Sequence, residues 1–155
     1  MDFLFFFGVA LIVFLLVYFL IIEHQKQKLE NQIFELSKNT LELTPEEFME
    51  MRNKKFGRGF HSTNFNFPGV YILHNKSKDT FYVGQGKKVL NRINSHFTGS
   101  GNGDVYADYK YGDYWTIKTI SLEDSNFDSL NELERYTIMA YDAYRNGYNK
   151  TRGNM

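Results

Sequence analysis

The most hydrophobic part of the chain is residues 3–22, FLFFFGVALIVFLLVYFLII, a run of twenty positions without a charge. A helix of this length spans the hydrocarbon core of a bilayer and satisfies its own backbone hydrogen bonds. The run is longer and less amphipathic than a typical buried helix, and it lacks the basic start and small-residue cleavage site of a signal peptide. We therefore expect residues 1–22 to be an uncleaved transmembrane anchor, in contact with the lipid bilayer through residues 3–22.

The charged residues around this segment predict its orientation. Only Met1 and Asp2 precede the apolar run, whereas His24, Lys26 and Lys28 follow it. The positive-inside rule then places the C-terminal part of the chain in the cytoplasm. The expected location is the cell membrane, with a single pass and a cytoplasmic domain.

Residues 23–66 have a mixed pattern and are predicted to form a helical, basic linker. Residues 23–38 have the spacing of a weakly amphipathic helix, which either continues the span as a spacer or mediates self-association. The sequence Thr-Pro-Glu-Glu at 44–47 is an N-terminal capping signature, so a second helix is expected to begin at Pro45. Residues 52–58 carry four positive charges, which suit nucleic-acid phosphates, anionic lipid headgroups or a solvated linker. Such a linker would give the following domain reach.

Residues 67–155 predict a single domain in which short strands and helices alternate. Two β-branched and aromatic runs flank a polar turn, as in an antiparallel hairpin, and Gly84 and Gly86 are expected to end its second strand. Residues 99–103, GSGNG, are expected to be a flexible connector. The predicted elements are strands at 70–74, 80–83 and 114–120, a helix from about Lys87, and a last long helix that starts after the capping residue Ser129 and reaches Tyr144. The fold class is therefore α/β (α+β), a small three-stranded, mainly antiparallel sheet with flanking helices.

Four side chains in the first half of this domain suggest a site. Tyr71 and Tyr82 lie on the two hairpin strands, and Arg92 and His96 share one face of the next helix because they are four residues apart. Taken singly, a strand tyrosine is ordinarily a core residue and such an Arg–His pair is ordinarily solvated. Their combination with the surrounding motifs favours a functional interpretation.

This combination resembles the GIY-YIG nuclease family. The two strand motifs that name the family correspond to GVY at residues 69–71 and YVG at residues 82–84, with valine in place of isoleucine in both. The replacement keeps a β-branched, buried residue. The resemblance covers about residues 68–150, and it implies the fold of these nucleases and a site of six residues. These residues are Tyr71, Tyr82, Arg92, His96, Glu134 and Asn149.

The resemblance also implies roles for these residues. Glu134, on the last long helix, would bind one divalent cation, Mg²⁺ or Mn²⁺, that keeps most of its water ligands. Arg92 suits the charge that develops on a phosphate in the transition state. Either tyrosine can serve as the base once a metal and an arginine lower its pKa, and the sequence does not choose between them. His96 is suited to binding the phosphate, orienting a tyrosine or relaying a proton, and Asn149 to orienting the site.

Composition limits these expectations. The chain has no cysteine, which excludes disulfides and thiolate metal sites. Its 18 basic and 18 acidic residues balance, so DNA, the expected partner, would have to be held by local patches. The expected function is that of a membrane-tethered, divalent-metal-dependent DNA endonuclease, with incoming DNA as its hypothetical substrate and no small-molecule substrate. The alternative is a catalytically inactive, membrane-anchored nucleic-acid-binding or adaptor module.

Overall fold

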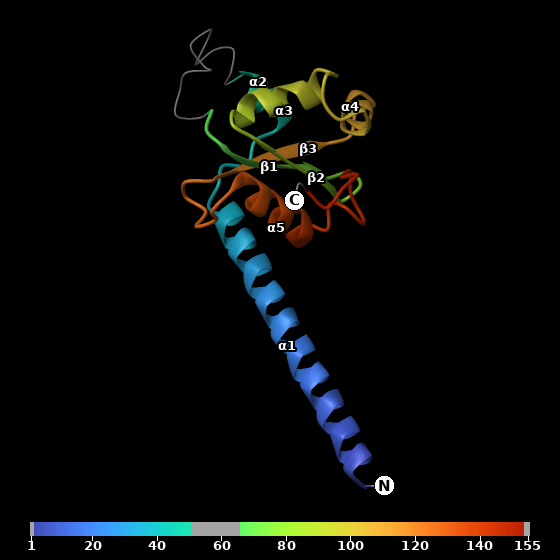
Figure 1. The fold of residues 1–155 in the computed structure, drawn as a ribbon. Coiled ribbons are helices and arrows are strands. Elements are labelled where there is room, and N and C mark those ends of the chain that lie inside the picture. The colour runs from blue at the N-terminus through green and yellow to red at the C-terminus, as the bar shows by residue number, and fades with distance from the viewer. Residues whose placement is uncertain (1, 51–65, 154–155) are drawn as a thin grey trace.

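The computed structural model describes residues 2–50 and 66–153, and Figure 1 shows its architecture. Three strands form one antiparallel sheet in the order β2-β1-β3, and a long N-terminal helix projects away from it. The predicted fold class is confirmed, whereas the basic stretch 52–58 lies outside the described residues. In chain order the elements are α1 (Asp2–Lys38), α2 (Pro45–Glu50), β1 (Gly69–Asn75), β2 (Thr80–Gly86), α3 (Val89–Phe97), α4 (Gly103–Lys110), β3 (Trp115–Ser121) and α5 (Leu130–Ala140).

The central strand β1 is buried on both faces of the sheet. Tyr71 and Leu73 belong to the apolar cluster that α2, α3 and α4 complete on one face. Val70 and Ile72 belong to the cluster on the other face, together with residues of α5 and the end of α1. Because side chains alternate along a strand, the apolar run of β1 fills two cores at once. Figure 1 shows the helices α3 and α4 on one side of the sheet and α5 on the other.

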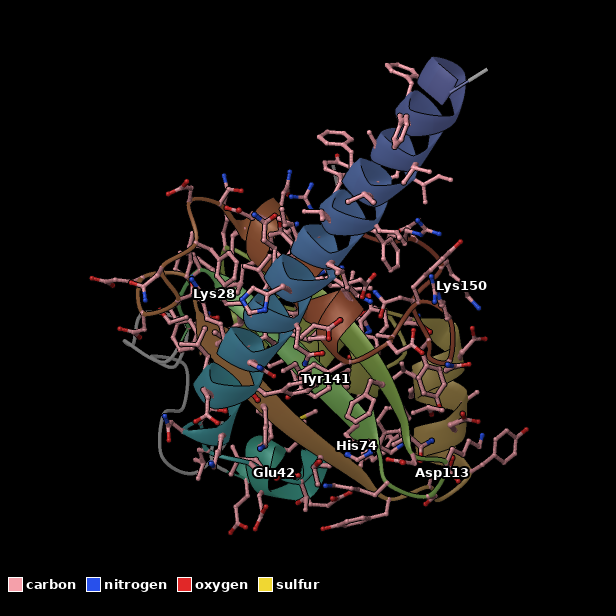
Figure 2. All side chains as sticks on the ribbon, turned by 90° about the horizontal axis from the view of Figure 1, so that it is seen from below. Lys28, Glu42, His74, Asp113, Tyr141 and Lys150 are labelled. Atoms are coloured by element: carbon pink, nitrogen blue, oxygen red, sulfur yellow. The ribbon has the colours of Figure 1, made fainter. Side chains whose placement is uncertain are left out.

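The C-terminal part of α1 packs against the domain. Ile33 is fully buried in the cluster on the α5 face. The ring of Phe34 lies 5.2 Å from that of Tyr141, and the Ser37 Oγ lies 2.6 Å from the Tyr141 hydroxyl oxygen. Figure 2, seen from the side of α1, shows Tyr141 next to this end of the helix. The apolar positions of the weakly amphipathic pattern are therefore used within the domain.

The chain after α1 then wraps around the sheet. Leu43 exchanges two backbone hydrogen bonds with Ile117, of 3.0 and 2.7 Å, along the outer edge of β3. Phe48 of α2 is buried in the core on the opposite face. The expectation that residues 23–66 act as a linker with free reach is thus wrong for residues 33–48, since these residues close one edge of the sheet and contribute to both cores.

Local signals predict the start of helices well. Thr44 N–H donates to Glu47 Oε2 at 2.8 Å and Glu47 N–H donates to Thr44 Oγ1 at 3.1 Å, which confirms the capping box of α2. Ser129 caps α5 through a 3.2 Å bond from Glu132 N–H. The sequence did not predict α4, which Asn102 caps by accepting hydrogen bonds from two backbone amides.

Two predicted ends differ from the structure. β2 continues to Gly86, since Gly84 and Gly86 pair with Tyr71 and Gly69 of β1 instead of ending the strand. The last helix, α5, ends at Ala140 and not at Tyr144, because Asp142 adopts a left-handed conformation with φ of 47°.

The apolar half of α1 stands clear of the domain. From Phe6 to Ile22 every large hydrophobic side chain is at least 42% exposed. The helix is long and apolar enough to cross a membrane, with a mean hydropathy of 2.7 in its most apolar part and none of that part buried in the protein. A buried core helix is therefore excluded as the explanation of this segment.

Candidate active site

Three aromatic rings meet between β1, β2 and α3. The ring centroids of Tyr71 and Tyr82 are 6.2 Å apart, and the His96 ring lies 5.5 Å from the first and 4.7 Å from the second. The strand register explains this arrangement, because Tyr82 lies opposite Leu73, on the same face of the sheet as Tyr71. Tyr71 and His96 are buried, whereas Tyr82 is half-buried. The structure thus brings together three of the six residues expected in the site.

The glycines of β2 make room for the polar ends of this cluster. Gly84 faces Tyr71 across the hairpin, and a Cβ there would lie 2.3 Å from the Tyr71 hydroxyl oxygen. At Gly86 a Cβ would lie 2.8 Å from the Cγ of Arg92, so the stem of this arginine crosses the strand where it has no side chain. Arg92 is exposed, and it joins the three rings as the fourth expected residue.

The hydrogen bonds of His96 fix its tautomer. The backbone N–H of Asn102 donates to His96 Nδ1 at 2.9 Å, and His96 Nε2 lies 2.9 Å from the Tyr71 hydroxyl oxygen. A backbone amide can only donate, so Nδ1 is the unprotonated nitrogen. The neutral ring therefore carries its proton on Nε2 and donates it to the Tyr71 oxygen. The 99–103 segment, expected to be only a flexible connector, packs tightly here, since a Cβ at Gly101 would lie 2.6 Å from Nδ1.

Burial shifts the pKa values of all three groups. Burial, followed by the charge of Tyr82, raises the pKa of Tyr71 well above its usual range. Burial also raises the pKa of Tyr82, although Arg92 and the hydrogen bond from Tyr71 oppose this effect. For His96, burial and the nearby Arg92 lower the pKa to about 4. At neutral pH the cluster is therefore uncharged, apart from Arg92 beside it.

Glu134 reaches the same end of β2 from the other face of the sheet. It lies on α5, is 8% exposed, and its Oε2 accepts a 2.9 Å hydrogen bond from Gln85 Nε2. Gln85 also donates to Asn131 Oδ1 at 2.8 Å. The Glu134 carboxylate is among the groups that raise the pKa of Tyr82, after burial as the main cause. The carboxylate is thus within electrostatic range of the tyrosine cluster, across the edge strand β2.

Asn149 lies on the outer edge of β2. Its Nδ2 donates to Val83 O and its Oδ1 accepts from Val83 N–H, both at 2.8 Å. The side-chain amide therefore pairs with the strand as a neighbouring strand would, and covers the edge that β1 leaves open. Asn149 holds the residue between Tyr82 and Gly84 in place, and its amide is occupied by that backbone contact.

Sequence reasoning missed the residues that hold the expected ones. Gln85, Asn131 and Asn102 carry no motif, and Asn102 acts on His96 through its backbone. One signal was present for Gln85, which shares the face of β2 with the buried Val83. A polar residue at that position needs a partner on α5, and Glu134 and Asn131 supply it.

This end of β2 combines a permanent cation, a carboxylate and two phenols. Across residues 2–50 and 66–153, no group of three or more His, Cys, Asp or Glu side chains is gathered as a metal cluster. Glu134 contacts Gln85, and Arg92 lies against the next residue, Gly86, so one carboxylate and one arginine lie at the same end of β2. A carboxylate and an arginine are suited to a hydrated cation and a phosphate ester.

Parts of this chain are similar to known proteins. The chain is 53% identical over 30 residues to the UvrABC system protein C of Methanosphaera stadtmanae, and 50% identical over 36 residues to that of Desulfitobacterium hafniense. The matches cover 19% and 23% of this chain and span only 5% and 6% of those proteins. A variant of the catalytic domain of intron endonuclease I-TevI superimposes with a TM-score of 0.44 and 23% identity, over 57% of this chain and 97% of that one.

The last comparison covers the domain as a whole. A family model described as the GIY-YIG catalytic domain matches residues 67–149. The match takes in both strand motifs, α3 with Arg92 and His96, α5 with Glu134, and Asn149. Because it spans more than half of the chain, the protein belongs to the GIY-YIG endonuclease family.

Proposed function

We propose that this protein is a membrane-tethered endonuclease that hydrolyses phosphodiester bonds in DNA with the help of a divalent metal ion. The observation that carries the proposal is the meeting of the tyrosine cluster, Arg92 and Glu134 at the glycine end of β2. Cleavage of a phosphodiester needs an activated water, a countercharge for the phosphorane and help for the leaving oxygen. Residues from both faces of the sheet supply groups for these tasks.

A divalent ion fits the donor set at Glu134. Nucleases of this family generally use divalent metal ions. A single carboxylate suits Mg²⁺, or Mn²⁺, because such an ion keeps several waters and completes its shell with substrate phosphate oxygens. When bound, it would polarise the phosphate and lower the pKa of a bound water. The hydrogen bond from Gln85 holds one oxygen of Glu134 and so orients the carboxylate toward its ligand.

Tyr82 is the better candidate for the general base. Tyr71 is fully buried, and its oxygen already accepts the His96 Nε2 proton. Tyr82 is half-buried, and both Arg92 and the hydrogen bond from Tyr71 favour its ionised form against the opposing effect of burial. The Tyr82 phenolate would take the proton of the attacking water at Oη. Since the pKa of Tyr82 is raised overall, the cleavage rate should increase with pH through neutrality.

His96 and Arg92 then have different tasks. His96 has its proton on Nε2 and its Nδ1 occupied by a backbone amide, so it orients Tyr71 and does not carry protons during the reaction. Arg92 is exposed and permanently charged, and it is suited to hold phosphate oxygens as negative charge develops. Asn149 acts as a positioning residue through Val83.

The exposed apolar half of α1 supports the membrane part of the proposal. We place the anchor at residues 1–22 in the cell membrane, with the nuclease domain, residues 67–155, in the cytoplasm. The helix continues without a break into the packed region near Ile33, so the domain would be held close to the bilayer. Self-association through residues 23–38 remains a prediction, and Ile33 would not contribute to it, because it is buried within the domain.

The full-length chain in detergent provides the test of activity. Incubation with supercoiled plasmid should give nicked and linear products with Mg²⁺ or Mn²⁺, and none with a chelator. Glu134→Gln and Arg92→Ala should each abolish cleavage, while Glu132→Gln, a change of the same kind on the same helix, should not. A fragment that starts near residue 60 is unsuitable, since it lacks Ile33 and Phe48 of the two cores. Plasmid binding without cleavage under all these conditions would instead indicate an inactive binding module.

The anchor and its purpose need separate measurements. A reporter fused after Met155 should be cytoplasmic, and the protein should remain with membranes through a carbonate wash. Tethering would confine cleavage to DNA near the membrane, and incoming DNA passes through that zone. Phage infection and DNA uptake should therefore differ between cells with the full chain and cells with a chain that lacks residues 1–22. If the chain that lacks residues 1–22 affects phage infection and DNA uptake as much as the full chain does, without added toxicity to the cell, the anchor has no role in this function.

A further inference from the structure

A cavity of about 610 Å³ opens between α1, α5 and the C-terminal segment, away from the candidate active site. Its lining contains four basic side chains from three parts of the chain and two acidic ones. The basic residues are Lys26 of α1, Arg135 of α5, and Arg145 and Arg152 of the C-terminal segment; the acidic residues are Glu30 and Asp142.

The arginines of this cavity are available to an anion. Among the described residues, no ion pair joins Arg135, Arg145 or Arg152 to a carboxylate. The guanidinium groups of Arg135 and Arg152 lie over the rings of Tyr136 and Tyr144, at 5.1 and 5.5 Å from the ring centroids. Stacking on a ring leaves the N–H edge of a guanidinium free to form the paired hydrogen bonds that phosphate oxygens accept.

The two carboxylates of the lining already have partners. Glu30 lies 3.8 Å from Lys26 Nζ, one turn away on α1. Asp142 Oδ2 accepts a hydrogen bond from Asn146 Nδ2. The lining thus has a surplus of two positive charges, four against two, and its three arginines are its unpaired cations among the described residues.

The cavity lies where α1 leaves the apolar run. Lys26 is four residues beyond Ile22, which corresponds to about 6 Å along the helix axis. The headgroup region of a bilayer is roughly 5–8 Å deep on each side of the hydrocarbon core. Figure 1 shows α5 on the side of the sheet toward which the apolar half of α1 projects. With residues 3–22 in the hydrocarbon core, Lys26 in the lining of the cavity lies at the depth of the lipid headgroups.

We propose that this cavity binds the headgroup of an anionic phospholipid and so fixes the orientation of the nuclease domain on the membrane. The proposal rests on the membrane anchor of the proposed function but not on its nuclease activity. A duplex DNA phosphate is the competing ligand. The place of the cavity beside the anchor, on the far side of α5 from the α3 face, favours the lipid.

Native mass spectrometry of the detergent-solubilised full chain tests the proposal. With equimolar phosphatidylglycerol and phosphatidylcholine, the wild type should retain phosphatidylglycerol selectively. The double variant Arg145→Gln/Arg152→Gln should bind it about fivefold less tightly for each charge removed. The double variant Lys110→Gln/Lys150→Gln removes the same charge outside the cavity and should bind it as the wild type does. All three proteins should melt at similar temperatures and cleave plasmid at similar rates in detergent.

Three results would overturn the proposal. Equal retention of the two lipids by the wild type shows that the cavity does not select an anionic headgroup. Equal loss of phosphatidylglycerol in both double variants shows a general charge effect. Weaker binding of a short DNA duplex by Arg145→Gln/Arg152→Gln, with lipid retention unchanged, assigns the cavity to DNA. Carbonate extraction of the wild type tests the membrane anchor separately. Release of the protein from membranes would contradict the anchor and, with it, the headgroup site, whereas the three results above would contradict the headgroup site alone.

Discussion

The two faces of the sheet contribute to the candidate site in different ways. On the α3 face, Tyr71 and His96 are buried, neutral and joined by a 2.9 Å hydrogen bond, and their geometry is complete without substrate. On the α5 face, the contribution is a carboxylate, Glu134, which an amide from Gln85 holds at the edge of β2. One face therefore supplies a rigid arrangement of hydrogen bonds, and the other supplies the charge that would bind a cation.

This difference predicts how substitutions on each face affect stability and activity. The groups on the α3 face also fill the core, so their substitution should alter stability and activity together. Glu134 belongs to neither apolar cluster, and its substitution by Gln should alter activity alone. Variants on the two faces should then differ in the ratio of these two effects.

Glu134→Gln should have the largest effect on cleavage. It keeps the size of the side chain but removes the charge that would hold the metal, so the rate should fall about a thousandfold or more. The melting temperature should stay close to that of the wild type. Plasmid nicking and thermal melting in the same detergent measure both quantities. A Glu134→Gln protein with a melting temperature far below that of the wild type would show that the Glu134 carboxylate is needed for the fold.

His96 should make stability depend on pH. In the folded protein the pKa of His96 is lowered to about 4, whereas an unfolded histidine titrates near 6.5. Between these pH values the unfolded chain binds more protons than the folded protein. The contribution of His96 to the free energy of unfolding is therefore complete above about pH 6.5 and is lost as the pH falls toward 4. The loss amounts to about 3 kcal/mol.

Thermal melting of the wild type and of His96→Gln, measured from pH 7.5 to pH 4, isolates this contribution. The difference in melting temperature between the wild type and His96→Gln should narrow as the pH falls. His74→Gln serves as the comparison. Burial also lowers the pKa of His74 but the hydrogen bond with Asp79 opposes this effect, so the difference in melting temperature should narrow less for His74→Gln than for His96→Gln. A difference in melting temperature between the wild type and His96→Gln that stays constant from pH 7.5 to pH 4 would contradict a neutral, buried His96.

Gly84→Ala should impair the α3 face through a single methyl group. The new Cβ would lie 2.3 Å from the Tyr71 oxygen, so the ring must move and its bond with His96 must lengthen. We expect a loss of about 1–3 kcal/mol in stability and about a hundredfold in cleavage rate. Gly103→Ala is the control, because no atom lies within 4 Å of its Cβ. Wild-type activity in Gly84→Ala would show that the position of the Tyr71 hydroxyl is unimportant.

Local patterns were sufficient for most elements of this fold, with α4 as the exception. The β-branched and aromatic runs of β1 and β2, the helical spacing of α3 and the caps of α2 and α5 are all properties of short segments, and the sequence predicts each of them. The ends of β2 and α5 were predicted wrongly because backbone pairing with β1 and a left-handed Asp142 decide them. Tertiary contacts overrode the local preference of glycine in the first case.

These local patterns did not predict the long-range packing. The sequence predicts a linker for residues 33–48, because the apolar side chains of Ile33, Leu43 and Phe48 gain their partners only when the chain wraps around the sheet. For the candidate site, the motifs name Tyr71, Tyr82, Arg92, His96, Glu134 and Asn149, and the roles of these residues stay a prediction. They did not reveal the role of Asn102 or Gln85, since a backbone amide and a lone strand glutamine have no sequence signature.

Gln85 offers the finest test of the difference between the faces. Gln85→Ala removes the 2.9 Å hydrogen bond that orients Glu134, while leaving the carboxylate itself and the whole α3 face intact. We expect cleavage at saturating Mg²⁺ to be nearly normal and the Mg²⁺ concentration for half-maximal rate to rise about tenfold. Asn131→Ala, which removes the second acceptor of the Gln85 amide, is the matched control and should raise this Mg²⁺ concentration less. If Gln85→Ala instead lowers the saturated rate without changing the Mg²⁺ requirement, the amide acts on the substrate and not on the carboxylate, and the contribution of the α5 face is more than its charge.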